Sequence, residues 1–127
     1  MAKSIISTPK VATPPAPISM ATKSGNLVFV AGIVALNEEG QLVGEGDIKK
    51  QTKQVLENIK ELVIAAGGNL LNITKTTVYI TDFTNYAEMN EIYEQYFKNE
   101  PPARATVRAD LFNPKLLVEI DAIAVVE

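Results

Sequence analysis

Arg104 and Glu119 are the two residues whose type and setting most directly indicate chemistry. Arg104 follows the double proline Pro101-Pro102 and begins a segment in which apolar and polar residues alternate, as they do in a half-buried strand. Glu119 lies inside the apolar run 116–126. A guanidinium and a carboxylate on two neighbouring strands can bind a small carboxylate ligand and activate a water molecule.

The two strands that carry these residues are predicted over about 103–110 and 115–125, joined as a hairpin by a turn at 112–115. In such a hairpin, Glu119 lies opposite Thr106 or Arg108. One face of the hairpin is then expected to carry Arg104, Thr106, Arg108, Glu119 and Asp121.

Two interpretations of this shared face are open. Arg108 with Glu119, or Arg104 with Asp121, can form cross-strand ion pairs on a solvated sheet surface. Alternatively, Arg104 holds a substrate carboxylate through two hydrogen bonds. Glu119, which is flanked by apolar side chains, would then have a raised pKa and act as a general base or acid.

Other candidate residues give weaker signals. Gly32 lies within an apolar strand, where a glycine marks either a bulge or the close approach of a backbone or ligand. Asn90 lies beside the apolar stripe of a predicted helix, where a local hydrogen bond is the ordinary role of an amide. Packing is the expected role of the four tyrosines, Tyr79, Tyr86, Tyr93 and Tyr96.

The composition excludes several kinds of site. The chain has 127 residues with no Cys and no His, so it has no thiolate nucleophile, no disulfide and no imidazole base. No phosphate-binding loop, nucleophile elbow or metal-ligand spacing occurs, and no cofactor is expected. The net charge of −3 and the lack of a Lys/Arg cluster argue against nucleic-acid binding.

Length and hydropathy indicate the number of domains and the location of the protein. The length fits a single domain over residues 1–127. No segment approaches the ~18 consecutive apolar residues that would span a membrane. The first residues lack the apolar core of a secretory signal, so a cytoplasmic location is expected.

Periodicity and turn signals predict the elements that position the candidate residues. Residues 9–17 carry four prolines and are expected to form an irregular, extended lead-in. The run 27–36 is apolar on both faces and is expected to be a strand. A turn at 37–40 is expected to close a hairpin onto a short segment at 42–43.

Two helices are predicted over 47–66 and about 84–98, with a β-branched strand at 74–80 between them. The order is then ββαβαββ, an α+β arrangement in which two helices pack on one face of a mixed sheet. Because strand positions on the second face are also apolar, neighbouring subunits are expected to cover it. A closed ring of three copies would do so.

Residues along nearly the whole chain resemble the reactive intermediate deaminase (RidA) family, also described as YjgF-like proteins. The strongest part of the resemblance is the segment 102–104 followed by 118–124. Further matching segments are 5–8, 46–52, 58–60, 65–67, 75–80 and 90–97. The resemblance implies a chorismate-mutase-like fold and a homotrimer with clefts between its subunits.

The resemblance also implies a reaction and a set of roles. The family hydrolyses reactive enamines and imines, such as 2-iminobutanoate and 2-iminopropanoate, to 2-oxo acids and ammonia. An arginine at the position of Arg104 binds the substrate carboxylate, and a glutamate at the position of Glu119 helps to place or activate water. Gly32 and Asn90 match positions that line the family's cleft.

Three departures from the family pattern concern the expected substrate-binding residues. Ile18 replaces a tyrosine, Thr106 replaces a cysteine, and Ala31-Gly32-Ile33 replaces the usual Ser-Gly-Gln. The cleft is therefore expected to be more apolar, with a changed substrate preference. A non-catalytic trimer that binds small carboxylates or has a regulatory role is the alternative. Ribonuclease activity, also described for the family, is disfavoured by the negative charge and the lack of His.

Overall fold

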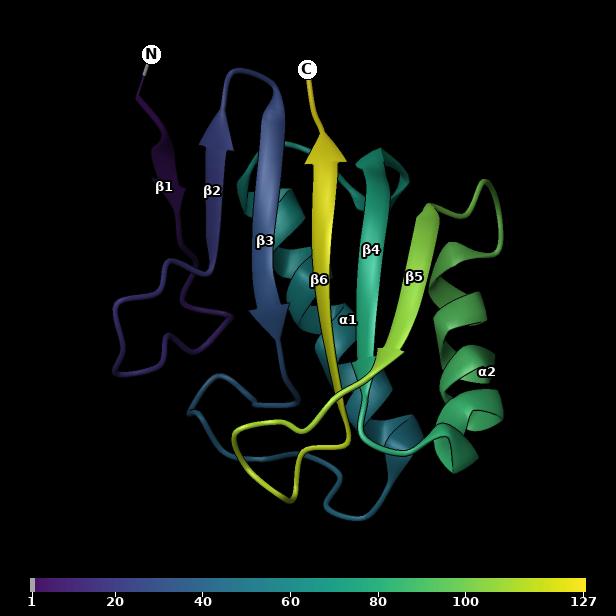
Figure 1. Ribbon diagram of the computed structural model, residues 1–127. Coiled ribbons are helices and arrows are strands. Elements are labelled where there is room, and N and C mark those ends of the chain that lie inside the picture. Colours follow the sequence, from purple (N-terminus) through teal and green to yellow (C-terminus); the bar gives the residue numbers. More distant parts are fainter. Residues whose placement is uncertain (1) are drawn as a thin grey trace.

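Six strands form one mixed sheet, and two helices lie on one of its faces (Figure 1). The computed structural model describes residues 2–127. The strands are β1 (Ser4–Ile6), β2 (Ala21–Ser24), β3 (Leu27–Ile33), β4 (Ile73–Ile80), β5 (Ala103–Arg108) and β6 (Val118–Val125). They lie in the order β1-β2-β3-β6-β4-β5, and only β4 and β5 are parallel neighbours. The predicted α+β architecture with two helices on one face is confirmed.

Local signals set the ends of the helices. The Asp47 carboxylate accepts a hydrogen bond of 3.1 Å from the backbone N–H of Lys50 and caps α1 (Ile48–Ala65). Gly67, with φ +97°, takes the left-handed conformation that ends it. The second helix, α2 (Tyr86–Phe97), begins later than predicted because a 3₁₀ turn, η2 (Phe83–Asn85), precedes it. Neither helix in the described part of the chain is long and apolar enough to span a membrane.

The hydrophobic core lies between the sheet and the helices. Alternate residues of β4 and β6 are buried on this side, as the side-chain period of a strand requires. The fully buried members from α1 and the sheet include Val28, Val55, Leu56, Ile59, Leu62, Val78, Ile80, Val118 and Ile120. The helix α2 adds Met89, Tyr93 and Phe97.

The predicted hairpin of the last two strands is wrong. β4 lies between β5 and β6, pairing with β5 in parallel and with β6 antiparallel. The chain between them, residues 109–117, is too long for a tight hairpin turn and passes beyond the end of β4 (Figure 1). The crossover through α2 places β5 beside β4, as is usual for parallel neighbours.

This order of strands also changes which residues share a face. Thr76 pairs with Arg104, and its side chain is buried on the helix side of the sheet. Tyr79 pairs with Glu119 on the opposite, open side. Because side chains alternate along a strand, Arg104 and Glu119 lie on opposite faces. The prediction of one face shared by Arg104, Thr106, Arg108, Glu119 and Asp121 is therefore wrong.

The first strands also differ from those predicted. The segment around Leu42 forms only one isolated bridge, to Leu36, instead of a hairpin strand. The sheet instead extends through β2 and β1, which are too short to produce a periodic sequence signal. Residues 9–17 contain no helix or strand, as predicted.

The open face of the sheet is uncovered in a single chain. Large apolar side chains are exposed on it: Leu27 and Val107 at 40%, Phe29 at 43% and Val125 at 36%. An apolar surface of this kind usually marks an interaction site. Coverage by neighbouring subunits stays a prediction.

Gln51 connects two loops through a buried side chain. Its Nε2 group donates to the carbonyl oxygens of Gly44, at 3.1 Å, and Lys115, at 2.8 Å. Its Oε1 atom accepts from the backbone N–H of Leu117, at 2.8 Å. The side chain is fully buried, so these backbone groups depend on it for their hydrogen bonds. It thereby fixes the entry to β6, the strand that carries Glu119.

We expect Gln51→Leu to lower the free energy of unfolding by about 2–4 kcal/mol, because it leaves buried backbone groups without partners. Urea denaturation measures this loss. The matched control is Gln95→Leu at an exposed position of α2, which should change stability by less than about 0.5 kcal/mol. Equal effects of the two substitutions would contradict a structural role for Gln51.

Candidate functional site

Arg104 is held in place by three side chains of α2. Its Nη1 group donates to Asn90 Oδ1, at 2.8 Å, and its Nη2 group donates to the Tyr86 hydroxyl, at 2.9 Å. The guanidinium carbon lies 4.7 Å from the centre of the Tyr93 ring and 5.7 Å from that of Tyr86. These contacts combine hydrogen bonding with cation–π attraction.

The support beneath Arg104 is rigid. The Tyr93 hydroxyl and the Thr76 hydroxyl are 2.7 Å apart, and both residues are buried. Burial raises the pKa of Tyr93, whereas the Asn90 amide and then the Arg104 charge lower the pKa of Tyr86. Arg104 still has N–H donors beyond those used by Asn90 and Tyr86, so it can also bind an anion.

Glu119, unlike Arg104, has no side chain among the described residues that holds it in place. Its carboxylate is half-buried on the open face and has no hydrogen-bond donor or cationic partner among residues 2–127. Burial raises the pKa of Glu119, and the nearby charge of Asp121 raises it further. Asp121 itself accepts a hydrogen bond of 3.1 Å from Tyr79. Glu119 therefore binds a proton more tightly than an ordinary carboxylate does, as a group that accepts a proton from water must.

Gly32 is the residue that makes room for Glu119. The pairing of β3 with β6 shifts between Val30 and Ile33, so Gly32 lies in a bulge. A Cβ atom at this position would overlap with the Glu119 carboxylate. The bulge interpretation of Gly32 therefore holds, and the group that approaches it within the chain is the Glu119 side chain rather than a backbone or a ligand.

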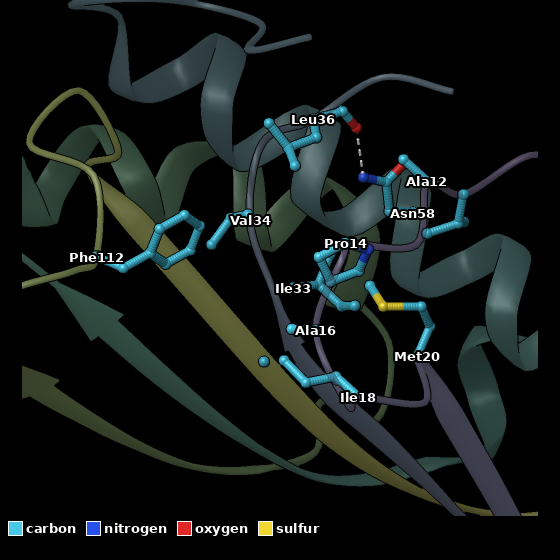
Figure 2. Close-up of a pocket in the computed structure, with 12 residues that line it drawn as sticks. Ala12, Pro14, Ala16, Ile18, Met20, Ile33, Val34, Leu36, Asn58 and Phe112 are labelled. Atoms are coloured by element: carbon cyan, nitrogen blue, oxygen red, sulfur yellow. Dashed lines mark hydrogen bonds between the residues drawn. The ribbon is translucent and has the colours of Figure 1, made fainter. Parts of the chain in front are cut away.

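A largely apolar cavity opens beside Gly32 (Figure 2). Its volume is about 230 Å³. The lining comes from the lead-in, the end of β3 and the residues after it, α1 and the 109–117 loop (Figure 2). The lining residues are Val11, Ala12, Pro14, Ala16, Ile18, Met20, Gly32, Ile33, Val34, Leu36, Asn58 and Phe112. The cavity therefore brings Ile18 and Gly32 together, and Gly32 connects it to Glu119.

The predicted site residues thus form two groups in one chain. Arg104 and Asn90 are in contact on the helix side, and Thr106 lies on that same face of β5. Gly32 and Ile18 line the cavity, and Glu119, on the open face of the sheet, lies against Gly32. Neither proposed ion pair, Arg108–Glu119 or Arg104–Asp121, forms within residues 2–127. The same residues contain no cluster of three or more metal-ligating side chains.

The sequence interpretation missed the contacts of Tyr86 and Tyr93 with Arg104, because it assigned both residues packing roles only. With Asn90 they occupy positions i, i+4 and i+7 of α2, which lie on one face of a helix. That spacing is a usable signal, because an aromatic–amide–aromatic face is well suited to holding a guanidinium.

The raised pKa of Glu119 predicts a pH-dependent cost to stability. The folded chain binds this proton more tightly than the unfolded chain does, so the free energy of unfolding falls as pH rises from the ordinary carboxyl range through the raised pKa. Glu119→Gln should therefore be more stable than wild type at neutral pH, and the difference should vanish below about pH 4. Urea denaturation of wild type and Glu119→Gln between about pH 4 and neutral pH tests this prediction. The exposed control Glu94→Gln should show no such trend, and a pH-independent gain for Glu119→Gln would contradict the prediction.

Comparisons with known proteins identify the family. The sequence profile described as Endoribonuclease L-PSP matches residues 9–126. A RutC family protein of Pyrococcus abyssi is 44% identical over 124 residues, which cover 98% of each chain. The fold is similar to RidA from the Antarctic bacterium Psychrobacter sp. PAMC 21119, with a TM-score of 0.90 and 33% identity over 97% of this chain and 99% of that one. It is equally similar to Escherichia coli TdcF with bound serine, with a TM-score of 0.90 and 32% identity over 98% and 99% of the two chains. The chain therefore belongs to the L-PSP family, and its resemblance to RidA-like proteins is confirmed.

Proposed function

We propose that the protein hydrolyses reactive 2-imino acids and their enamines, of the 2-iminobutanoate and 2-iminopropanoate type, to 2-oxo acids and ammonia. The observation that carries this proposal is the half-buried Glu119 carboxylate, which has a raised pKa and no partner within the described chain. Such a group lowers stability, and carboxylates with perturbed pKa values cluster at functional sites. Membership of a family associated with imine deamination supports the same activity.

The reaction uses the two charged residues in separate roles. Arg104 donates hydrogen bonds to the substrate carboxylate and holds the imine carbon in place. Glu119 accepts a proton from a water molecule as the water oxygen bonds to that carbon, and the C=N electron pair moves to nitrogen. Glu119 then returns the proton to the nitrogen. It next takes the remaining proton from the new hydroxyl group and passes it to the amine nitrogen. The C–N bond breaks as the C=O bond forms, so neutral ammonia leaves without any redox change.

We infer that each site takes Arg104 and Glu119 from two different copies of the chain. Within one copy the two side chains lie on opposite faces of the sheet, an arrangement that separates them from a shared substrate. We place Arg104, Asn90 and Thr106 of one copy opposite Glu119, Gly32 and Ile18 of the next. A closed homotrimer would form three such sites and would also cover the exposed apolar face.

The departures at Ile18 and Thr106 are compatible with this chemistry. An imine is already electrophilic and water is the nucleophile, so the reaction needs no thiol. Thr106 retains a hydroxyl that can donate or accept a hydrogen bond. The apolar Ile18 affects the shape of the site rather than the proton transfers.

A second candidate function is binding of small carboxylates without turnover. The related TdcF was crystallised with bound serine, a small carboxylate. The arginine anchor alone would support such binding in this chain. RNA cleavage, which the family description names, is less compatible with a net charge of −3 and the absence of His.

The anchor role of Arg104 is tested by comparing two arginines on the same strand face. We expect Arg104→Ala to lower kcat/KM for 2-iminopropanoate by about 30- to 1000-fold, because it removes a charge-assisted hydrogen-bond donor. Arg108→Ala, at an exposed position with the same orientation, should change it less than about threefold. The imine is generated in situ by an amino-acid oxidase and its decay is followed. Equal catalysed rates for wild type and Arg104→Ala would refute the anchor role of Arg104. If wild type decays the imine no faster than the uncatalysed reaction, the deaminase proposal fails, and pyruvate binding by wild type would then favour the binding function.

The two-copy site is tested by mixing two inactive variants. Arg104→Ala subunits retain Glu119, and Glu119→Gln subunits retain Arg104, so a mixed ring rebuilds one intact site. For random mixing of equal amounts in a closed trimer, activity should recover to about one quarter of wild type. The subunits are exchanged by partial denaturation and refolding. As a control, the double variant mixed with an equal amount of wild type should leave about one quarter of wild-type activity, below the one half that dilution alone gives. Absence of recovery in exchanged trimers would place both residues of a site in one copy.

A further inference from the structure

We propose that the cavity beside Gly32 binds the side chain of the substrate, and that the preferred substrates are 2-imino acids with branched aliphatic or aromatic side chains. This inference rests on the proposed imine hydrolysis and specifies its substrate class.

The cavity lies next to the residue that we propose activates water. Gly32 lines the cavity and also lies directly against the Glu119 carboxylate. Glu119 itself is not among the lining residues, so we place the water molecule that it holds on its Gly32 side, at the edge of the cavity. The carbon that this water attacks also carries the substrate side chain. That side chain must point either into the cavity or away from it, and the cavity offers it an apolar surface.

The lining of the cavity is almost entirely apolar. The cavity has no charged lining side chain, and Asn58 contributes its only side-chain amide. Both ends of that amide are already paired within the chain. Its Nδ2 group donates to the Leu36 carbonyl, at 2.8 Å (Figure 2), and its Oδ1 atom accepts from Gln54 Nε2, at 2.8 Å. Each end of the amide therefore already has one partner, and no other lining residue has a charged or amide side chain. A polar or charged substrate side chain would lose most of its hydration here with little replacement.

The cavity is large enough for a branched or aromatic side chain. An engineered apolar cavity of about 150 Å³ in another protein is large enough to bind benzene. The cavity of about 230 Å³ therefore accommodates an isobutyl or benzyl group. A methyl group would leave most of the apolar wall without contacts. Met20, which lines the cavity, has a flexible side chain that can adjust to either shape.

The test compares imines that differ only in side chain. An amino-acid oxidase generates them from L-alanine, L-leucine and L-phenylalanine, and their decay gives kcat/KM. We expect the leucine- and phenylalanine-derived imines to exceed the alanine-derived imine by at least about tenfold, since each added methylene in an apolar pocket contributes strongly to selectivity.

Two variants localise the preference. Ala12 is half-buried in the cavity wall, so Ala12→Leu should fill part of the cavity. We expect this variant to lower the ratio of kcat/KM for the leucine-derived imine to that for the alanine-derived imine by at least about tenfold. Met20→Ala should shift the preference further towards the phenylalanine-derived imine. Ala65→Leu, at an exposed position at the end of α1, is the control and should leave all three values unchanged. Thermal unfolding confirms that each variant is folded.

The outcomes separate this inference from the proposed function. Turnover of all three imines at similar rates, or equal losses for all three in Ala12→Leu, would overturn the cavity assignment and leave the deaminase proposal intact. Absence of turnover with every imine would refute the deaminase proposal. Calorimetry with pyruvate and 4-methyl-2-oxopentanoate then still tests the cavity, which requires the larger acid to bind more tightly.

Discussion

The register of β4 with its two neighbours is the constraint on which the arrangement of the site depends. Thr76 pairs with Arg104 on the helix side, and Tyr79 pairs with Glu119 on the open side. A strand shifted by one residue would move each side chain to the other face. The buried β-branched residues of β4 make such a shift costly, because they would leave the core. The separation of the two charged residues is therefore a property of the core itself.

The two charged residues are prepared for function in different ways. Arg104 has its orientation fixed in advance by Asn90, Tyr86 and Tyr93, so little conformational entropy is lost when it binds an anion. Glu119 is instead left half-buried without a partner, a condition that raises its pKa. A preorganised cation and an unpaired carboxylate supply different functions, so the proposed two-copy site would combine an anchor for an anion with an acceptor for a proton.

Much of the fold could be predicted from local sequence signals, whereas strand pairing could not. Asp47, the apolar period and Gly67 agree on the limits of α1, so its predicted range differs from the observed one by a single residue at each end. The alternation in 103–110 and 115–125 fits either a hairpin or two strands separated by β4, because alternation carries no information about the partner strand. The wrong pairing then placed Arg104 and Glu119 on one face.

Among the features of the site, too, some could be predicted from the sequence and others could not. The special character of Gly32 could be predicted, because a glycine weakens an apolar strand and therefore marks a bulge or a close approach there. The cavity could not be predicted, because its walls come from four separate segments whose meeting depends on the tertiary fold. The role of the lead-in as one of these walls has no sequence signature beyond its prolines.

The lead-in also has a consequence for how the protein can diverge. Residues 9–17 have no helix or strand, so their side chains can change without disturbing the register of the sheet. Arg104 and Glu119, by contrast, lie in strands whose neighbours fix them. Exposed residues of the lead-in that line the cavity, such as Ala16, are therefore less constrained by the fold than the strand residues that hold the charges, whereas Val11 is buried in the core. Evolution could alter what enters the cavity while the reactive groups stay where they are.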